Sequence, residues 1–494
     1  MRFFGINHGQ HDAGIACINE EGELLVFSQT ERLTRRKSDS SVGFLNRLLG
    51  MFGIDPVGAN DFFFTTWPNH YKSFFDKQIW PDEFSSKMTS SILGFDRQLR
   101  VHYLSHHLCH IATSWMFRDT ESLDESLYIA IDGSGCRTDG SEGFYSIGVI
   151  SLKQFQEHNN NLDKYVYSPH HRLNRIRLPS TSRLEVAGKL MGLSGYIPSA
   201  KFKRLPFDHR ITSLNRRIER DGLTESAMIE CASIYWSYTE DLKDHIRQIL
   251  DKYKHKNVVV GGGAFLALEL NTWLVEQGRN IIFGPPINDS GIALGSAAYG
   301  YFLAKGEWPR RLDTPYLQWC PQFKTDYISP QLAALYLMNG EILGLITGKG
   351  EAGPRALGNR SLLAVPTMEN ARKASMEIKG REFYRPLAPI VTERCFDNLF
   401  IGPKGRHMQF RNFCTEHAKI LAPGIVHKDN TARVQVLDPC QHPWLYELLV
   451  EIGKKTGVEC LINTSLNAKG MAICNTLEDA IADFSKTNVR LVSL

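Results

Sequence analysis

Two histidines near residue 110 stand at the spacing of a metal-binding pair. His106 and His110 are four residues apart, so on a helix both imidazoles point to one side and can hold one ion. A pair of histidines at this spacing binds no metal about as often as it binds one, so a third ligand is needed to favour a metal site. Asp289 supplies one, in a polar turn before an apolar run at 292–298. Two histidines and a carboxylate suit Fe(II) or another divalent transition metal.

Three turns that follow apolar strands carry glycine or acidic residues. A strand that ends in glycine lets backbone N–H groups approach a phosphate closely. One such turn is weak evidence, whereas three in one block favour a phosphate-bearing nucleotide. Asp132 then stands where it can orient water or a metal ion near the phosphates. The turns contain His11 and Asp12; Asp132, Gly133 and Gly135; and Gly261, Gly262 and Gly263.

Two lysines of the same block are further candidates. Lys37 ends the basic run 31–37, and Lys189 lies in the glycine-flanked segment 188–193. A solvated helix face explains most charge runs. Because the run 31–37 follows a strand of the expected nucleotide domain, Lys37 is also placed to reach a phosphoryl group, and a similar reasoning applies to Lys189.

The last third of the chain is rich in arginine, lysine and amide side chains. Guanidinium groups bind phosphate in bidentate fashion, and hydroxyl and amide groups complete an anionic pocket. A single arginine is usually a surface ion pair, but four clusters predict a pocket for a doubly anionic molecule or a triphosphate. The run 351–361 reads as a rigid turn that presents two arginines, Arg355 and Arg360. The candidates are Arg355; Lys379, Arg381 and Arg385; His427 and Arg433; and Asn463, Ser465 and Asn467.

At least two domains must position these residues, because 494 residues exceed a single hydrophobic core. The strand and glycine pattern predicts an α/β protein whose first block has two similar halves, and the proline-rich stretch 305–330 reads as a connection. Strands are expected at 3–7, 13–18 and 24–28 as an antiparallel meander, and at 126–131, 257–260, 342–346 and 460–462. Helices are expected at 264–274, 292–298, 444–454 and 477–485.

The amino-acid composition indicates in which cellular compartment the protein is expected and which classes of partner are not expected. A net charge of +4 gives no sign of nucleic-acid binding. No apolar run approaches the roughly 18 residues of a membrane helix, and the amino terminus turns polar too early for a signal peptide. The ten cysteines form no Cys-x-x-Cys pair. We therefore expect a cytoplasmic protein with reduced thiols and no membrane partner.

The ordered set of motifs resembles the NodU/CmcH family of O-carbamoyltransferases over nearly the whole chain. Departures fall at Cys136-Arg137, Ala352 and 470–472, where the family usually has other residues, and they put the acceptor side of the first site in question. The matching motifs are His11-Asp12, 31–37, 106–110, 132–135, 188–193, 261–263, 289–291, 353–361, 379–382, 385–389, 429–433 and 463–467.

The resemblance implies two domains with separate tasks. An actin/hexokinase/Hsp70-like domain over 1–310, similar to the threonylcarbamoyl transferases, would carry out transfer with a metal ion on His106, His110 and Asp289. A YrdC-like α/β domain over 325–494 would make carbamoyl-adenylate from carbamoyl phosphate and ATP, with Mg²⁺ as a further candidate ion. The implied catalytic set is His11, Asp12, Lys37 and Asp132, with His11 or Asp12 taking the hydroxyl proton. The remaining candidates would bind the nucleotide and phosphate groups.

The acceptor and the assembly stay open. The implied partner is a small molecule with a hydroxyl group, such as a sugar, a natural product or a nucleotide, and its pocket is expected in the stretches 60–100 and 150–185. A homodimer is left open. One alternative is a threonylcarbamoyl-type tRNA-modifying transferase with a fused YrdC partner, which would bind RNA with steep salt dependence. Another is a nucleotide-binding regulator without catalysis.

Overall fold

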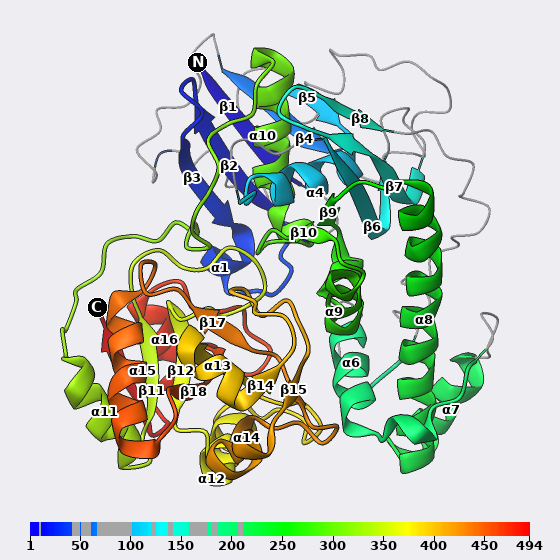
Figure 1. The fold of residues 1–494 in the computed structure, drawn as a ribbon. Helices are drawn as coiled ribbons and strands as arrows, with labels where there is room; N and C mark the ends of the chain where they lie inside the picture. Colours follow the sequence, from blue (N-terminus) through cyan, green and yellow to red (C-terminus); the bar gives the residue numbers. More distant parts are fainter. Residues whose placement is uncertain are drawn as a thin grey trace.

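The computed structural model describes residues 1–8, 11–41, 50, 61–66, 101–119, 125–136, 142–157, 176–179, 186–205 and 211–494. The chain forms two α/β units (Figure 1). The amino-terminal unit runs from strand β1 to helix α10, and the carboxy-terminal unit runs from helix α11 to strand β19. Within the described ranges, no helix combines the length and the apolar character needed to cross a membrane. The predicted α/β class is confirmed.

The amino-terminal unit contains two five-stranded sheets of the same topology. In each, three antiparallel strands in chain order are extended by two parallel strands, giving the orders β3-β2-β1-β4-β5 and β8-β7-β6-β9-β10. This duplication is the arrangement expected of an actin/hexokinase/Hsp70-like fold. The strands are β1 (Arg2–Asn7), β2 (Gly14–Asn19), β3 (Leu24–Gln29), β4 (Phe62–Thr66), β5 (Val101–Leu104), β6 (Ser126–Cys136), β7 (Glu142–Ile150), β8 (Phe155–Glu157), β9 (Asn257–Gly261) and β10 (Asn280–Ile282).

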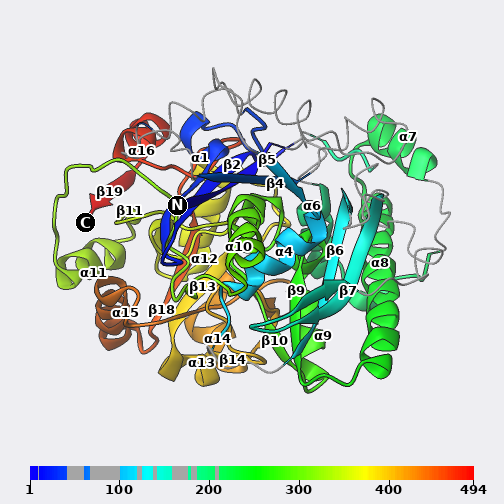
Figure 2. The same cartoon turned by 90° about the horizontal axis from the view of Figure 1, so that it is seen from above.

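Two buried helices separate the sheets. Helix α10 (Ile292–Lys305) packs on the first sheet, helix α4 (His106–Trp115) packs on the second, and the two helices contact each other (Figure 2). A Cβ at Gly295 would lie 1.9 Å from the carbonyl oxygen of Cys109. The close crossing therefore requires glycine at this position, and it fixes α4 against the end of α10 that follows Asp289.

The second sheet has a helix layer on each face, and β6 shows the alternation this requires. Leu127 and Ile129 pack in the core that includes residues of helix α8. Tyr128 and Ala130, on the other face of β6, pack in the core that contains α4 and α10. Among the described residues, the helices outside the central pair are α1 (Thr30–Thr34), α6 (Val186–Tyr196), α7 (Ile211–Asp221), α8 (Glu225–Lys252) and α9 (Leu268–Glu276).

A mixed six-stranded sheet, in the order β17-β13-β18-β12-β11-β19, forms the carboxy-terminal unit. Leu343 and Leu345 pack under α11 and α15, whereas Ile342 and Ile346 pack in the opposite core with α13 and α16. The strands are β11 (Ile342–Ile346), β12 (Arg360–Ala364), β13 (Ala388–Thr392), β17 (Gln435–Leu437), β18 (Cys460–Ser465) and β19 (Val489–Ser493), and the small sheet adds β14 (Phe400–Ile401), β15 (Asn412–Cys414) and β16 (Thr431–Ala432). The helices are α11 (Pro330–Met338), α12 (Met368–Arg372), α13 (Glu393–Leu399), α14 (Glu416–Leu421), α15 (Pro443–Thr456) and α16 (Leu477–Phe484).

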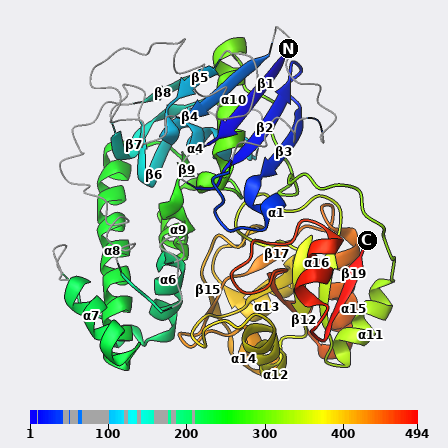
Figure 3. The ribbon, with the colours of Figure 1, turned by 180° about the vertical axis from the view of Figure 1, so that it is seen from behind.

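The two units contact each other along two edges. At one edge, the connection between α10 and α11 carries Gln318, which forms isolated bridges with Phe27 of the amino-terminal unit and Gly350 of the carboxy-terminal unit. At the other edge, α6 and α9 lie beside the carboxy-terminal unit (Figures 1 and 3). There the Thr272 hydroxyl donates to the Arg411 carbonyl at 3.1 Å. The space between the two edges holds the candidate site.

Candidate functional site

One cavity of about 620 Å³ is lined by both units. The amino-terminal unit contributes carboxylates, and the carboxy-terminal unit contributes guanidinium groups. The predicted site residues that line it are His11, Asp12, Lys37, Asp132, Gly133, Lys189, Gly263, Asp289, Arg355, Lys379, Arg381, Arg385, His427, Arg433, Asn463, Ser465 and Asn467. Residues from the two separate halves of the sequence therefore share one space.

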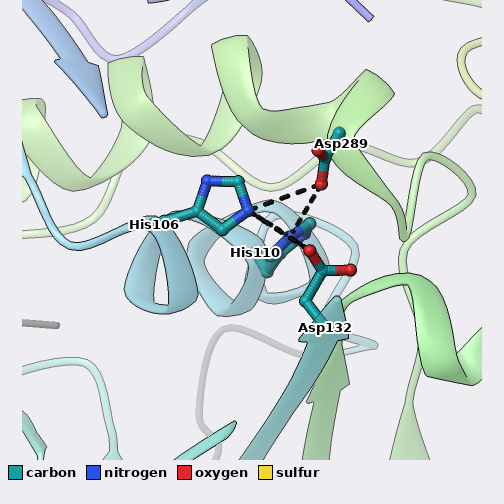
Figure 4. Close-up of side chains that lie close together, drawn as sticks. All are labelled: His106, His110, Asp132 and Asp289. Carbon is teal, nitrogen blue, oxygen red and sulfur yellow. Dashed lines mark hydrogen bonds and ion pairs between the residues drawn. The ribbon is translucent and has the colours of Figure 1, made fainter. Parts of the chain in front are cut away.

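Four side chains converge (Figure 4) beside the amino-terminal end of this space, and of the four, Asp132 and Asp289 line the cavity. The Nε2 atoms of His106 and His110 lie 3.1 Å apart. Oδ1 of Asp289 lies 3.4 Å from Nε2 of His106 and 3.2 Å from Nε2 of His110. Oδ2 of Asp132 completes the group, at 3.5 Å from His106 and 3.8 Å from His110. The structure thus brings the three predicted metal ligands together and adds Asp132.

Three elements fix the four side chains. His106 and His110 lie on consecutive turns of α4, whose first turn is capped by the Ser105 hydroxyl, which accepts from the Leu108 amide at 3.3 Å. Asp289 opens the turn that leads into α10. Asp132 lies within β6 where its register against β7 shifts, and such an irregularity can re-aim a side chain.

The four residues fit a divalent metal ion. The four ligand atoms all lie within 4.8 Å of one another. Two imidazole nitrogens with carboxylate oxygens are the donors that Fe(II) and related transition metals prefer. Burial by itself lowers the pKa of His106, but the charges of Asp289 and Asp132 outweigh it and raise that pKa to about 10. Burial raises the pKa of Asp132, but hydrogen bonds from His106 and His110 outweigh it and hold that pKa well below its usual value.

The four candidate metal ligands, His106, His110, Asp132 and Asp289, are called the metal cluster below. His11 and Asp12 lie beside it. Nδ1 of His11 is 2.8 Å from Oδ2 of Asp12, and Nε2 of His11 is 3.5 Å from Oδ2 of Asp289. Asp12 has a φ of 56°, in the left-handed region that Asp tolerates better than most side chains. Burial lowers the pKa of His11, but the hydrogen bond to Asp12 and the charge of Asp289 raise it to about 9. In the ion-free protein this pKa keeps the His11 ring protonated at neutral pH.

Asn7, at the end of β1, is a site residue that the sequence patterns did not single out. Its Nδ2 donates to the carbonyl oxygens of Asp12 at 2.7 Å, Asp289 at 3.2 Å and His11 at 3.4 Å. One buried amide thus ties the His11 turn to the Asp289 turn. An asparagine that ends a predicted strand next to a candidate turn is the only local signal for this role.

The carboxy-terminal end of the cavity is a cluster of like charges. The guanidinium groups of Arg355, Arg381 and Arg433 have no hydrogen-bond or ion-pair partner among the residues that the structure describes. Burial, and then repulsion from neighbouring arginines, lowers the pKa of Arg355 to about 10 and of Arg381 to about 9. Arg385 has only a long ion pair with Glu382, at 3.7 Å. Half-buried cations without a compensating charge, as Arg355, Arg381 and Arg433 are, mark an anion-binding pocket.

Lys379 is held by the end of β18. Its Nζ donates to the Ser465 hydroxyl at 3.1 Å, to the Asn467 side chain at 2.7 Å and to the Asn467 carbonyl at 3.0 Å. Burial, followed by the charges of Arg381 and then Lys37, lowers its pKa well below the usual value. Lys37 thus comes from the amino-terminal unit to the edge of this pocket. Asn463 and Ser465 lie within β18, not after a strand as the sequence predicted.

The turn at 351–361 presents one arginine to the cavity, not two. Oε1 of buried Glu351 accepts from the backbone amides of Leu357, Asn359 and Arg360, at 2.7, 2.9 and 3.0 Å. The Arg360 guanidinium is fully buried and donates to backbone carbonyls, including that of Thr347 at 2.7 Å. Arg360 therefore locks the turn, and Arg355 alone faces the cavity.

Two further predicted residues line the cavity but are engaged with protein groups. Nζ of Lys189, on α6, forms an ion pair of 2.5 Å with Oε1 of Glu382 in the other unit. His427 lies between Asp429, at 3.3 Å from Nδ1, and the Tyr384 carbonyl, at 3.4 Å from Nε2. Both contacts position side chains of the anion pocket.

The glycine turns serve close packing as well as the cavity. Gly263 lines the cavity, and its amide donates to Oδ1 of Asp132 at 2.7 Å. A Cβ at Gly261 would lie 2.9 Å from His110, and one at Gly262, where φ is +101°, would lie 2.2 Å from the Ile131 carbonyl oxygen. These two glycines let β9 approach α4 and β6. Gly133 and Gly135 lie in β6, with Gly133 at the cavity.

The predicted acceptor stretches fall mostly outside the described residues. Of 60–100 and 150–185, the structure describes 61–66, 150–157 and 176–179. Arg137, one of the departures from the family pattern, also lies outside the described ranges.

One family model matches the carboxy-terminal unit of the chain. Residues 334–494 match the family model described as Carbamoyltransferase C-terminus. Nodulation protein NolNO of Sinorhizobium fredii is 28% identical over 440 residues, covering 79% of this chain and 62% of its own length. The chain therefore spans less than two thirds of that relative. HypF, in a crystal structure of its phosphate- and nucleotide-bound form, is 15% identical, with a TM-score of 0.37 over 61% of this chain and 56% of its own.

A second relative matches almost end to end. Nodulation protein U of Rhizobium tropici is 32% identical, in an alignment that covers 95% of this chain and 91% of the relative. The match therefore includes the metal cluster and the arginine pocket. The chain belongs to the nodulation protein U family of carbamoyltransferases.

Proposed function

We propose that the chain is an ATP-dependent O-carbamoyltransferase. It takes carbamoyl phosphate and ATP, forms carbamoyl-adenylate, and passes the carbamoyl group to a hydroxyl of a small molecule such as a sugar, a natural product or a nucleotide. The observation that carries the proposal is the shared cavity, which joins Asp132 and Asp289 to Arg355 and Arg381. Two opposite electrostatic environments in one cavity suit a reaction that makes and then consumes an anionic intermediate.

The first step belongs to the arginine pocket. Water cleaves carbamoyl phosphate to carbamate and inorganic phosphate. A carbamate oxygen then attacks the α-phosphorus of ATP, the bond to the β-phosphate oxygen breaks, and pyrophosphate leaves. Arg355, Arg381 and Arg433 carry no protein partner in the described chain, so they are free to bind these anions and offset the charge that develops on the leaving group. Lys379 holds Ser465 and Asn467 at the pocket wall.

The second step belongs to the metal cluster. The acceptor oxygen attacks the carbamoyl carbon, the bond to the phosphate oxygen breaks, and AMP leaves. A divalent ion held by His106, His110, Asp132 and Asp289 would supply a Lewis acid for the phosphate of the adenylate. His11 accepts the hydroxyl proton, because Asp12 holds its Nδ1 and leaves Nε2 as the acceptor. A divalent cation bound by Asp289 would offset the negative charge that raises the pKa of His11.

Pyrophosphate release tests the proposal. Wild-type protein is incubated with ATP and carbamoyl phosphate, with and without a panel of hydroxylated acceptors, and pyrophosphate is measured. We expect release that depends on carbamoyl phosphate and that a triple alanine variant at Lys379, Arg381 and Arg385 does not support. Absence of release, or equal release by the triple variant, contradicts the proposal.

A further inference from the structure

The turn that carries Arg355 touches the segment that carries Asp289. Gly353 has a φ of +96°, and a Cβ built there would lie 2.7 Å from the carbonyl oxygen of Pro285. Gly353 precedes Arg355 by two residues, and Pro285 precedes Asp289 by four. At this contact, the backbone that leads to Arg355 in the anion pocket touches the backbone that leads to Asp289 in the metal cluster.

Two buried side chains of the amino-terminal unit hold this turn. Oε1 of Gln29 accepts from the Gly353 amide at 3.0 Å, and Nη2 of Arg32 donates to the Gly353 carbonyl at 2.7 Å. Arg32 also approaches the Glu351 carbonyl at 3.5 Å. Gln29 is 2% exposed and Arg32 is 1% exposed, so both contacts are shielded from water. Gly353 is thus held through both its amide and its carbonyl.

Gln318 of the connecting segment fixes Gln29 in turn. Its Oε1 accepts from the Gln29 amide at 2.8 Å, and its Nε2 donates to the Ser28 hydroxyl at 3.1 Å. Its backbone exchanges two hydrogen bonds with Gly350, at 3.0 and 3.2 Å. A continuous set of buried bonds therefore runs from the edge of the first sheet through the connection to the arginine turn.

We propose that Gln29 and Arg32 are positioning residues that keep the shared cavity closed to water where the arginine pocket adjoins the metal cluster. The proposal rests on the proposed function, because it concerns the adenylate that passes across this junction. By fixing Gly353 against Pro285, the two side chains hold Arg355 at one distance from Asp289 and keep the mixed anhydride inside until an acceptor arrives.

Acceptor-free turnover of the full chain tests this role. Wild type receives ATP and carbamoyl phosphate without an acceptor, and pyrophosphate is followed from the first turnover. We expect a burst of about one equivalent per chain and then a slow phase, because the adenylate stays bound. In Gln29→Leu and Arg32→Met the burst amplitude stays the same, while the slow phase becomes about tenfold faster as adenylate escapes and hydrolyses.

A matched control separates this role from general loosening of the interface. Thr272→Val removes two inter-unit hydrogen bonds at the opposite edge, where the Thr272 hydroxyl donates to the Arg411 carbonyl and accepts from the Arg411 amide. We expect its burst and slow phase to equal those of wild type. A slow phase raised equally in Thr272→Val, or unchanged in both Gln29→Leu and Arg32→Met while wild type shows its burst, overturns the inference and leaves the proposed function standing. No pyrophosphate from wild type overturns the proposed function itself.

Discussion

Nε2 of His106 faces Nε2 of His110 at 3.1 Å, with a carboxylate oxygen of Asp289 within 3.4 Å of both. Two imidazole nitrogens at this distance can share only one proton favourably, so without an ion the pair depends on the two aspartates for balance. A divalent cation at the centre of the two imidazole nitrogens and the two carboxylate oxygens would bind all four ligand atoms at once. The cluster is therefore better suited to holding a metal ion than to stabilising the fold.

Removing one of these imidazoles should separate the two half-reactions. In His106→Ala, we expect bound metal to fall at least about tenfold, because a ligand is lost. Acceptor-free pyrophosphate release should stay near the wild-type burst, because the arginine pocket is intact. Metal is measured by elemental analysis after dialysis, and pyrophosphate by a coupled assay.

His107 offers a matched control on the same helix. Its Nδ1 lies 2.9 Å from the Ser146 hydroxyl, and it is not part of the metal cluster. His107→Asn should keep the metal content of wild type. Equal metal loss in the two variants would argue against a site built round His106.

Metal affinity should rise with pH. In the ion-free protein, Asp289 and Asp132 overcome the effect of burial and raise the pKa of His106 to about 10. At neutral pH the ion must therefore displace a proton, and affinity should increase by up to about tenfold per pH unit until the pH approaches that pKa. Titration calorimetry in buffers of different ionisation enthalpy counts the released protons. Affinity that does not change between about pH 7 and pH 9 would contradict the prediction.

Asn7 should act through the ligands that it positions. Asn7→Ala removes the donor to the carbonyls of Asp12 and Asp289, so both turns lose a shared anchor. We expect metal affinity to fall about 10- to 100-fold, as for other residues that orient ligands. The thermal midpoint and the pyrophosphate burst, measured alongside, should change little. An unchanged metal affinity would show that the turns hold themselves in place.

The arginine pocket should cost stability when it is empty. Arg355, Arg381 and Arg433 repel one another, which contributes to their lowered pKa values. Arg381→Met should therefore raise the thermal midpoint of the ligand-free protein by about 2 °C. Pyrophosphate should stabilise wild type more than the variant, as measured by differential scanning fluorimetry. A ligand-free midpoint that falls would mean that the guanidinium group stabilises the fold.

Local sequence patterns predicted strands and helices well where the periodicity of neighbouring residues alone determines the secondary structure. The strand expected at 342–346 has those bounds, and the meander expected at 3–28 is β1, β2 and β3. The spacing of His106 and His110 predicted their convergence because helical geometry alone sets it. The expected helix at 264–274 was partly wrong, since a short 3-10 turn at Gly263–Leu266 precedes α9.

Residues whose roles depend on distant partners could not be predicted. Asp132 was predicted at the end of a strand near the phosphates, but its place among the metal ligands follows from the register shift of β6, which continues to Cys136, five residues beyond the expected end at 131. Arg360 looked equivalent to Arg355 in sequence, yet it is buried against the carbonyls of Thr347 and Asn475. Asn7 gains its role from a turn 282 residues away. No local period or motif carries such information.

Isotope transfer tests the central claim most directly. The full chain is mixed with ATP and carbamoyl phosphate labelled with ¹³C at the carbonyl, without an acceptor, and quenched within the first turnover. Mass spectrometry should find labelled carbamoyl-AMP in an amount equal to the pyrophosphate released. Pyrophosphate without labelled carbamoyl-AMP, or labelled carbamoyl phosphate that stays intact while ATP is consumed, would contradict a shared cavity that makes and holds this intermediate.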